Sequence, residues 1–176
     1  NYYKSFGNFA SVSLGETFQL LGESLEKFEV INDSGTVDFK PQRLIVNCPT
    51  LKVFRLENVP YLQGALDLSG SNFLESINVN NSNINAVLLP STPTLKDIVL
   101  SGTIKELILH DLSNLVNDHL VLSNWGALET IDIAGCPKLD SLAVITQAIK
   151  SKAPLHKVVA PNINWVISDL EVFNKL

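Results

Sequence analysis

The feature that most constrains this chain is a short motif, apolar-x-apolar, that returns about every eleven residues between turn residues. Alternation with a period of two is typical of a β-strand that buries one face. The recurring motifs are Phe28-x-Val30, Leu44-x-Val46, Phe54-x-Leu56, Leu66-x-Leu68, Ile77-x-Val79, Val87-x-Leu89, Ile98-x-Leu100, Leu107-x-Leu109, Leu120-x-Leu122, Ile131-x-Ile133 and Val158-x-Ala160. Self-similarity at a fixed period indicates a repeat architecture, in which stacking of neighbouring repeats supplies the stability.

The motifs form two interleaved series when each is identified by its second apolar residue. One series is Leu56, Val79, Leu100 and Leu122, with steps of 23, 21 and 22 residues. The other is Val46, Leu68, Leu89, Leu109, Ile133 and Ala160, with steps of 22, 21, 20, 24 and 27 residues. Each coil of about 22 residues therefore contains two short strands, one on each side. We expect two parallel sheets over a shared core, with strands centred near residues 55, 78, 99 and 121 and near residues 45, 67, 88, 108 and 132.

Five segments share the pattern L-x-x-L-x-L, with Phe, Ile or Val at the later apolar positions and Ile in first place in one of them. They are residues 51–56, 74–79, 95–100, 104–109 and 128–133. Over roughly residues 25 to 160 the chain resembles the leucine-rich repeat family, and residues 47–51 and 135–139 resemble irregular bacterial repeats of surface proteins. The resemblance implies a repeat solenoid of the β-rich α/β class, leucine-rich-repeat-like, with two short parallel strands per coil and a C-terminal helix. The Asn ladder of the family is missing, so we expect Ser, Thr and backbone groups to form the hydrogen bonds of the turns. We also expect a solenoid that is flatter and less regular than a strongly curved horseshoe.

The length of the chain suits one domain over residues 1–176. We expect residues 1–24 to form an N-terminal cap with a helical turn at Phe18–Leu21, residues 25–138 to form the repeat array, and residues 139–176 to form a C-terminal cap region. In that last region a stripe with a period near 3.6 predicts a helix over residues 139–152, which Pro154 ends. A short final helix is expected over residues 165–173.

Composition argues against several classes of function. The net charge is −5 and the Lys and Arg residues do not cluster, so we expect no nucleic-acid partner. No apolar run reaches about 18 residues, so we expect no membrane insertion. The chain begins with Asn1 and has no Met, which indicates a processed chain or a segment of a larger protein. Cys48 and Cys136 lie about four coils apart, so we expect free, buried thiols.

No catalytic constellation is evident, and we expect no enzymatic activity, no cofactor and no metal site. His110 and His119 belong to different strand series, hence to opposite sheets, which argues against a shared metal. Asp67 and Asp132 share an outward register but lie about three coils apart, too far for paired acid–base work.

Two outward surfaces remain as candidates for contact with a partner. On the second series the candidate contact residues are Leu88 and Ile108, expected as neighbours on one ladder, with Asp67 and Asp132 on either side. This strip is either a docking surface or ordinary filling of a sheet by residues of high β-propensity. The alternative face, on the first series, consists of Arg55, Asn78, Val99 and Val121, with polar outward neighbours that include Ser101 and Ser123.

The sequence thus favours a non-catalytic binding or adhesion module that recognises a protein or a glycan through one sheet, within a larger surface or secreted protein. An extracellular or cell-surface location is favoured, and a virion is the other setting. The alternative is a structural assembly domain of a virion or other large complex, with no ligand of its own. An accessory domain of an enzyme would differ only in what flanks this segment.

Overall fold

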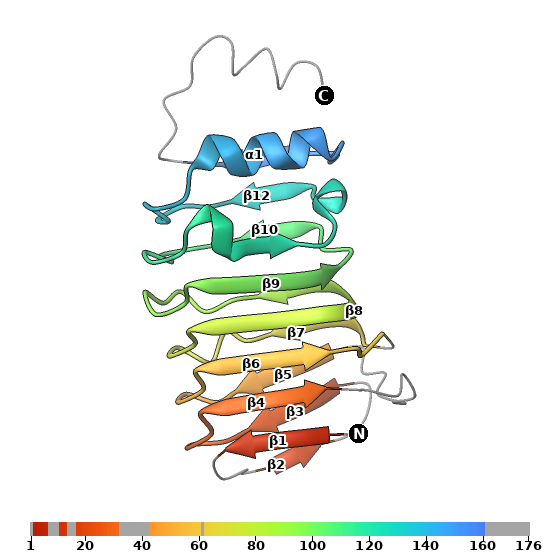
Figure 1. Ribbon diagram of the computed structural model, residues 1–176, viewed down its shortest axis with the longest axis vertical. Coiled ribbons are helices and arrows are strands. Elements are labelled where there is room, and N and C mark those ends of the chain that lie inside the picture. Colours follow the sequence, from red (N-terminus) through yellow and green to blue (C-terminus); the bar gives the residue numbers. More distant parts are fainter. Residues whose placement is uncertain (1, 7–10, 14–16, 32–42, 61, 161–176) are drawn as a thin grey trace.

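The computed structural model describes residues 2–6, 11–13, 17–31, 43–60 and 62–160. Within these residues the protein is a β-rich α/β structure with a curled sheet, a small parallel sheet and the α-helix α1 (Ser141–Lys150). Figure 1 shows the strands stacked one above another from the N-terminal end up to α1. The helix expected over residues 165–173 lies outside the described part of the chain.

One side of the stack, called the first face, carries the strands of the first series. Its strands, in spatial order, are β1 (Tyr2–Phe6), β4 (Lys27–Ile31), β6 (Val53–Glu57), the first part of β8 (Ser76–Leu88), β9 (Asp97–Gly102) and β11 (Leu120–Leu122). All neighbouring pairs are parallel except β1 with β4. The parallel register aligns Arg55, Asn78, Val99 and Val121 in one outward row.

The opposite side, called the second face, carries the strands of the second series. Its strands are β2 (Ser11–Ser13), β3 (Thr17–Leu21), β5 (Arg43–Asn47), β7 (Gln63–Asp67), the last part of β8, and then β10 (Glu106–Ile108), β12 (Thr130–Asp132) and β13 (Lys157–Val159). The last three form a separate parallel sheet. All nine predicted strand centres therefore lie within β-strands.

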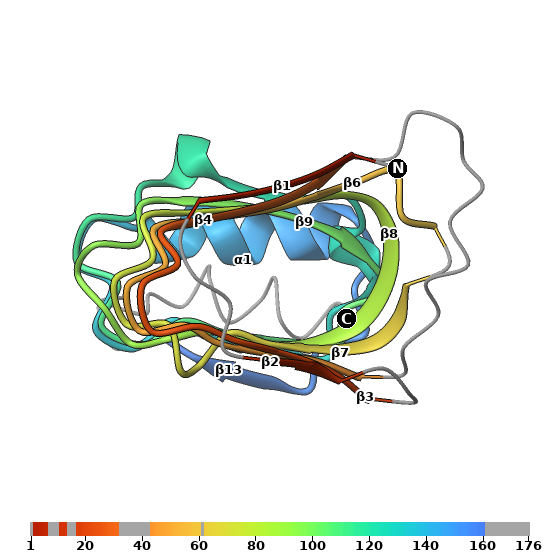
Figure 2. The same ribbon diagram turned by 90° about the horizontal axis from the view of Figure 1, so that it is seen from below.

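Strand β8 joins the two faces, which corrects the expectation of one sheet on each side. Residues 76–80 pair with β6, and residues 83–88 pair with β7, so one strand serves both series. Figure 2 shows β8 curving around the side of the core. No Gly or Pro interrupts residues 76–88, and Asn81 takes a left-handed conformation (φ 51°) where the pairing changes. The strand therefore bends instead of ending, because Asn tolerates this conformation better than most residues.

The core lies between the two faces and is filled by the repeated apolar positions. Each L-x-x-L-x-L segment places its three apolar residues inside; Leu51, Phe54 and Leu56, for example, are at most 1% exposed. Phe28 and Phe54 stack across β4 and β6, with ring centroids 5.6 Å apart. Burial of one such side chain stabilises the fold by about 1.5–3 kcal/mol, so loss of a single layer is costly.

Hydroxyl groups connect successive turns of the chain. The Thr50 hydroxyl donates to the carbonyl of Leu25 at 3.0 Å, and the Thr94 hydroxyl donates to the carbonyl of Leu74 at 2.7 Å. Backbone hydrogen bonds also connect successive turns nearby; for example, the Glu75 N–H donates to the Lys52 carbonyl at 2.8 Å. Ser, Thr and backbone groups therefore satisfy part of the turns, as expected, but Asn side chains contribute too, since Asn114 Nδ2 donates to the Pro93 carbonyl at 2.7 Å.

Two local expectations were wrong. Phe18–Leu21 is not a helical turn but part of β3, because Phe18 and Leu20 alternate into the core and the strand pairs in parallel with β5. Ser101 does not face solvent. It is 7% exposed, since β9 loses its alternation at the end where it meets the bend in β8.

Helix α1 confirms the helix predicted over residues 139–152. The Asp140 side chain caps its N-terminus by accepting from Ala143 N–H at 3.1 Å, and Lys150 lies in its last turn, where a cation is favoured. Val144, Ile145 and Ala148 form its buried side. In Figure 1 α1 lies at the top of the stack, beyond β11 on the first face, where another strand would otherwise continue the ladder. No helix in the described ranges is long and apolar enough to cross a membrane.

Candidate contact faces and a pocket at the end of the stack

The second-face strip is exposed but is not one continuous ladder. Leu88 is 48% and Ile108 39% exposed, in line with their predicted outward direction. Leu88 belongs to β8 of the curled sheet, whereas Ile108 belongs to β10 of the small sheet, so the expected ladder contact between them is wrong. The reason is that the chain after β9 occupies the edge of β8, where Thr103 N–H donates to the Ile84 carbonyl at 2.9 Å.

The two carboxylates beside this strip are bound within the protein. Asp67, the ladder partner of Leu88, accepts from Arg43 at 3.1 Å and from the Ser69 hydroxyl at 2.6 Å. Burial alone would raise the pKa of Asp67, but the hydrogen bonds from Ser69 and Arg43 outweigh burial and lower it. Asp132, the ladder partner of Ile108, lies 3.1 Å from His110 Nε2. The charge of Asp67 is thus met by Arg43, whereas His110 balances the charge of Asp132 only when its ring is protonated.

The outward row of the first face changes from charged to apolar along the stack. Arg55 binds Glu57 at 2.5 Å and lies 3.8 Å from Glu29. Asn78 follows it on the ladder, and then Val99 and Val121, of which Val121 is 46% exposed. Polar contact is therefore possible at one end of the row and apolar contact at the other.

Two polar atoms in this row lack partners. Arg55 Nε and Asn78 Oδ1 are both buried, and neither makes a hydrogen bond to any of the described residues. One is a donor and the other an acceptor, and their residues are direct ladder partners.

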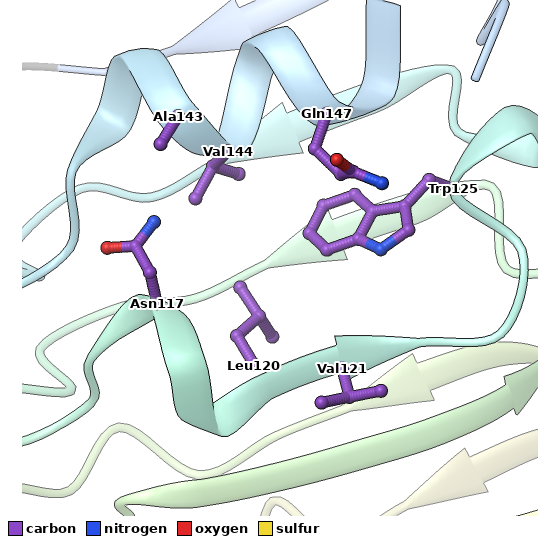
Figure 3. A pocket seen from close by; sticks show the side chains of 7 residues that line it. All are labelled: Asn117, Leu120, Val121, Trp125, Ala143, Val144 and Gln147. Carbon is purple, nitrogen blue, oxygen red and sulfur yellow. The ribbon is translucent and has the colours of Figure 1, made fainter. Parts of the chain in front are cut away.

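A pocket of about 360 Å³ opens at the apolar end of the first face, between β11 and α1. It is lined by Asn117, Leu120, Val121, Trp125, Ala143, Val144 and Gln147, as Figure 3 shows. Strand β11 pairs with β9 on one side only among the described strands. A helix satisfies its own backbone hydrogen bonds and meets its neighbours through side chains, so α1 cannot continue the ladder and stays farther from β11 than a strand would.

Some polar groups of the pocket already have hydrogen-bond partners within the protein, and others have none among the described residues. The Asn117 amide is committed to Asp140: its Oδ1 accepts from the Asp140 N–H at 2.7 Å, and its Nδ2 donates to the Asp140 carbonyl at 3.2 Å. In contrast, no described residue hydrogen-bonds the indole N–H of Trp125 or the side-chain amide of Gln147. In Figure 3 the Gln147 amide lies beside the indole ring. None of the seven lining residues is ionisable.

The backbone around Trp125 is held tightly against the end of α1. Trp125 begins a 3-10 turn, Trp125–Ala127, and the next residue, Gly126, contacts Ser151 just after the helix. A Cβ added at Gly126 would lie 2.5 Å from the Ser151 carbonyl oxygen, which is closer than real contacts allow. Only Gly therefore permits this approach, and the approach sets the position of the indole.

Sequence reasoning placed Val121 on an outward face but missed the rest of the pocket. Its residues come from two 3-10 turns, a strand and a helix, and no local pattern joins these elements. No local signal marked it, since Trp125 lies in the turn between the intact motifs at residues 120–122 and 131–133, well before the helix predicted from residue 139.

The histidines and cysteines lie as the register predicted. His110 faces Asp132 on the second face, and His119 pairs with Asp97 on the first. In the part of the chain that the structure describes, no three His, Cys, Asp or Glu side chains come together in a way that could hold a metal ion. Cys48 and Cys136 are free and buried, and burial raises the pKa of the Cys48 thiol to about 11 despite a backbone hydrogen bond at Gly22.

Comparisons of the chain with models of protein families, with curated proteins and with solved structures found no match. A function for this protein must therefore be argued from the chemistry of its two faces and of the pocket.

Proposed function

We propose that the chain is a leucine-rich-repeat-like solenoid that acts as a non-catalytic binding module within a larger surface or secreted protein. Support comes from the parallel pairing of strands about 22 residues apart and from the burial of the repeated apolar positions. The L-x-x-L-x-L segments carry the resemblance to the family. A stack of this kind presents broad, rigid faces, which suit recognition.

The contact surface is the C-terminal end of the first face. The observation that carries this choice is the pocket, because Val99 and Val121 run directly towards it and Val121 forms part of its wall. The polar side chains of Arg55 and Asn78 lie farther along the same row. A concave apolar site beside a polar surface is the usual anatomy of a binding site.

A second candidate function is structural assembly through the second face. Leu88 and Ile108 are large, apolar and exposed, and Asp67 and Asp132 beside them contact Arg43 and His110. Such a strip can pack against a neighbouring subunit with the charge of Asp67 paired, and with that of Asp132 paired when His110 is protonated. Two apolar side chains make a small patch, however, and single exposed apolar residues are common.

Two double variants distinguish the functions. Val99→Lys with Val121→Lys places charges on the first face, and Leu88→Lys with Ile108→Lys places the same charges on the second. Each protein is immobilised and probed with arrays of purified cell-surface proteins and glycans, and its oligomeric state is measured by light scattering. We expect the first-face variant alone to lose binding. Loss of assembly in the second-face variant, with array binding absent throughout, would instead support the structural role.

A further inference from the structure

We propose that the pocket between β11 and α1 binds one uncharged sugar ring of a glycan, with Trp125 as its aromatic wall and Gln147 as its polar contact. The inference rests on the proposed binding function and names the ligand class for the first face. Three properties of the pocket carry it: the absence of charge, the mixture of apolar surface with unused polar groups, and a rigid frame.

Absence of charge selects for an uncharged ligand. None of the seven lining residues is acidic, basic or a histidine. A phosphate, a carboxylate or an ammonium group entering this pocket would lose hydration without gaining an opposite charge, which is strongly unfavourable. The nearest histidine in sequence, His119, is already paired with Asp97. Charged sugars, nucleotides and charged peptide side chains are therefore poor candidates.

The polar groups select against a purely apolar ligand. Leu120, Val121 and Val144 offer apolar surface, but the Trp125 indole N–H and the Gln147 amide are polar groups that no described residue hydrogen-bonds. An aliphatic or phenyl side chain of a peptide would cover these groups and leave them unpaired, at the full cost of their desolvation. A sugar ring has an apolar C–H face and hydroxyl groups that both donate and accept, so it can satisfy both kinds of surface.

The frame of the pocket is fixed before any ligand arrives. Asn117 is locked onto Asp140, which also caps α1, and this joins the strand side of the pocket to the start of the helix. Gly126 holds the Trp125 turn against Ser151, which joins the other side to the helix end. A preformed site loses less conformational entropy on binding. Its volume, about 360 Å³, lies near the lower end for small-molecule pockets and suits one ring better than a long chain.

The test is nuclear magnetic resonance on the ¹⁵N-labelled chain. The indole N–H of Trp125 is assigned with a Trp165→Phe variant, since the chain has two Trp residues. Methyl glycosides of glucose, galactose, mannose, fucose and N-acetylglucosamine are titrated to tens of millimolar. We expect a saturable shift of the Trp125 indole signal with at least one glycoside. N-acetyl-leucine amide serves as the probe for a peptide side chain and is expected to cause no saturable shift.

Variants of the pocket supply the controls. Gln147→Ala and Trp125→Phe are expected to weaken the glycoside about fivefold or more, as loss of one hydrogen bond implies, measured by saturation transfer to the sugar. Leu142→Ala removes an exposed apolar side chain of the same helix that does not line the pocket and is expected to change nothing. Gln147 is exposed, so its replacement leaves the fold intact, which circular dichroism checks.

The possible failures are distinguishable. No shift with any of the five glycosides, shifts that the pocket variants leave unchanged, or tighter binding of N-acetyl-leucine amide would each overturn the sugar assignment. If the Val99→Lys, Val121→Lys variant still loses a protein partner found on the arrays, the binding function stands without the sugar site. If neither glycosides nor array partners bind, both proposals fail.

Discussion

Replacement of Ser101 by Ala tests the most consequential difference between sequence pattern and structure. The alternation along β9 places Ser101 at the surface, where loss of its hydroxyl would be nearly neutral. In the structure Ser101 is 7% exposed and lies against the bend in β8. Its hydroxyl accepts from the Ser82 N–H at 2.9 Å and donates to the Ser82 carbonyl at 3.1 Å. One side chain thus satisfies both backbone groups of Ser82.

The expected loss follows from these two bonds. Ser101→Ala leaves the Ser82 N–H and carbonyl without the hydroxyl, and an unsatisfied buried donor costs about 1–3 kcal/mol. With the second bond included, we expect a loss of about 2–4 kcal/mol in the free energy of unfolding. For a chain of this length that corresponds to a fall of about 5–15 °C in Tm. Urea and thermal unfolding followed by circular dichroism measure both quantities.

Ser123→Ala is the matched control. Ser123 lies 22 residues after Ser101, at the equivalent position behind β11, but it is exposed. Its hydroxyl accepts one bond, from the Gly102 N–H at 3.2 Å, which water can replace. We expect a change below about 0.5 kcal/mol. Equal unfolding midpoints for the two variants would show that Ser101 does not stabilise the bend and would refute the reasoning.

Three further predictions follow from single groups. Gly102→Ala should lower stability by more than about 3 kcal/mol, measured by urea unfolding, since a Cβ at φ +128° would lie 2.0 Å from the Ile84 carbonyl oxygen; a midpoint like wild type would contradict this geometry. Folding lowers the pKa of Asp67 below its ordinary value of 3.8, so its negative charge stabilises the folded protein at pH values above 3.8. Asp67→Asn should therefore destabilise the protein at pH 7, and the difference from wild type should vanish as the pH falls through the lowered pKa. Cys48, with a pKa of about 11, should resist thiol reagents at pH 8 until the chain unfolds, and fast labelling of the native protein would count against its burial.

The sequence alone determined the strands of the repeat array and the helix, but it predicted a helical turn where β3 lies. Alternation with a period of two is what a short strand needs to bury one face, and it repeats often enough to locate all nine predicted strand centres. The 3.6-residue stripe before Pro154 located α1 in the same way. These signals are local, because each depends only on the residues of one segment and requires only that one side of that segment be buried.

Only the tertiary structure decided how these segments meet. The pattern through residues 76–88 contains two strands by periodicity, but whether the chain breaks or bends between them depends on β6, β7 and β9 around it. The burial of Ser101 and the separation of Leu88 from Ile108 both follow from that bend. The pocket depends on the distance that α1 keeps from β11, which side chains far apart in sequence set together. Periodicity reports which side of an element is buried, whereas the spacing between elements is a property of their packing.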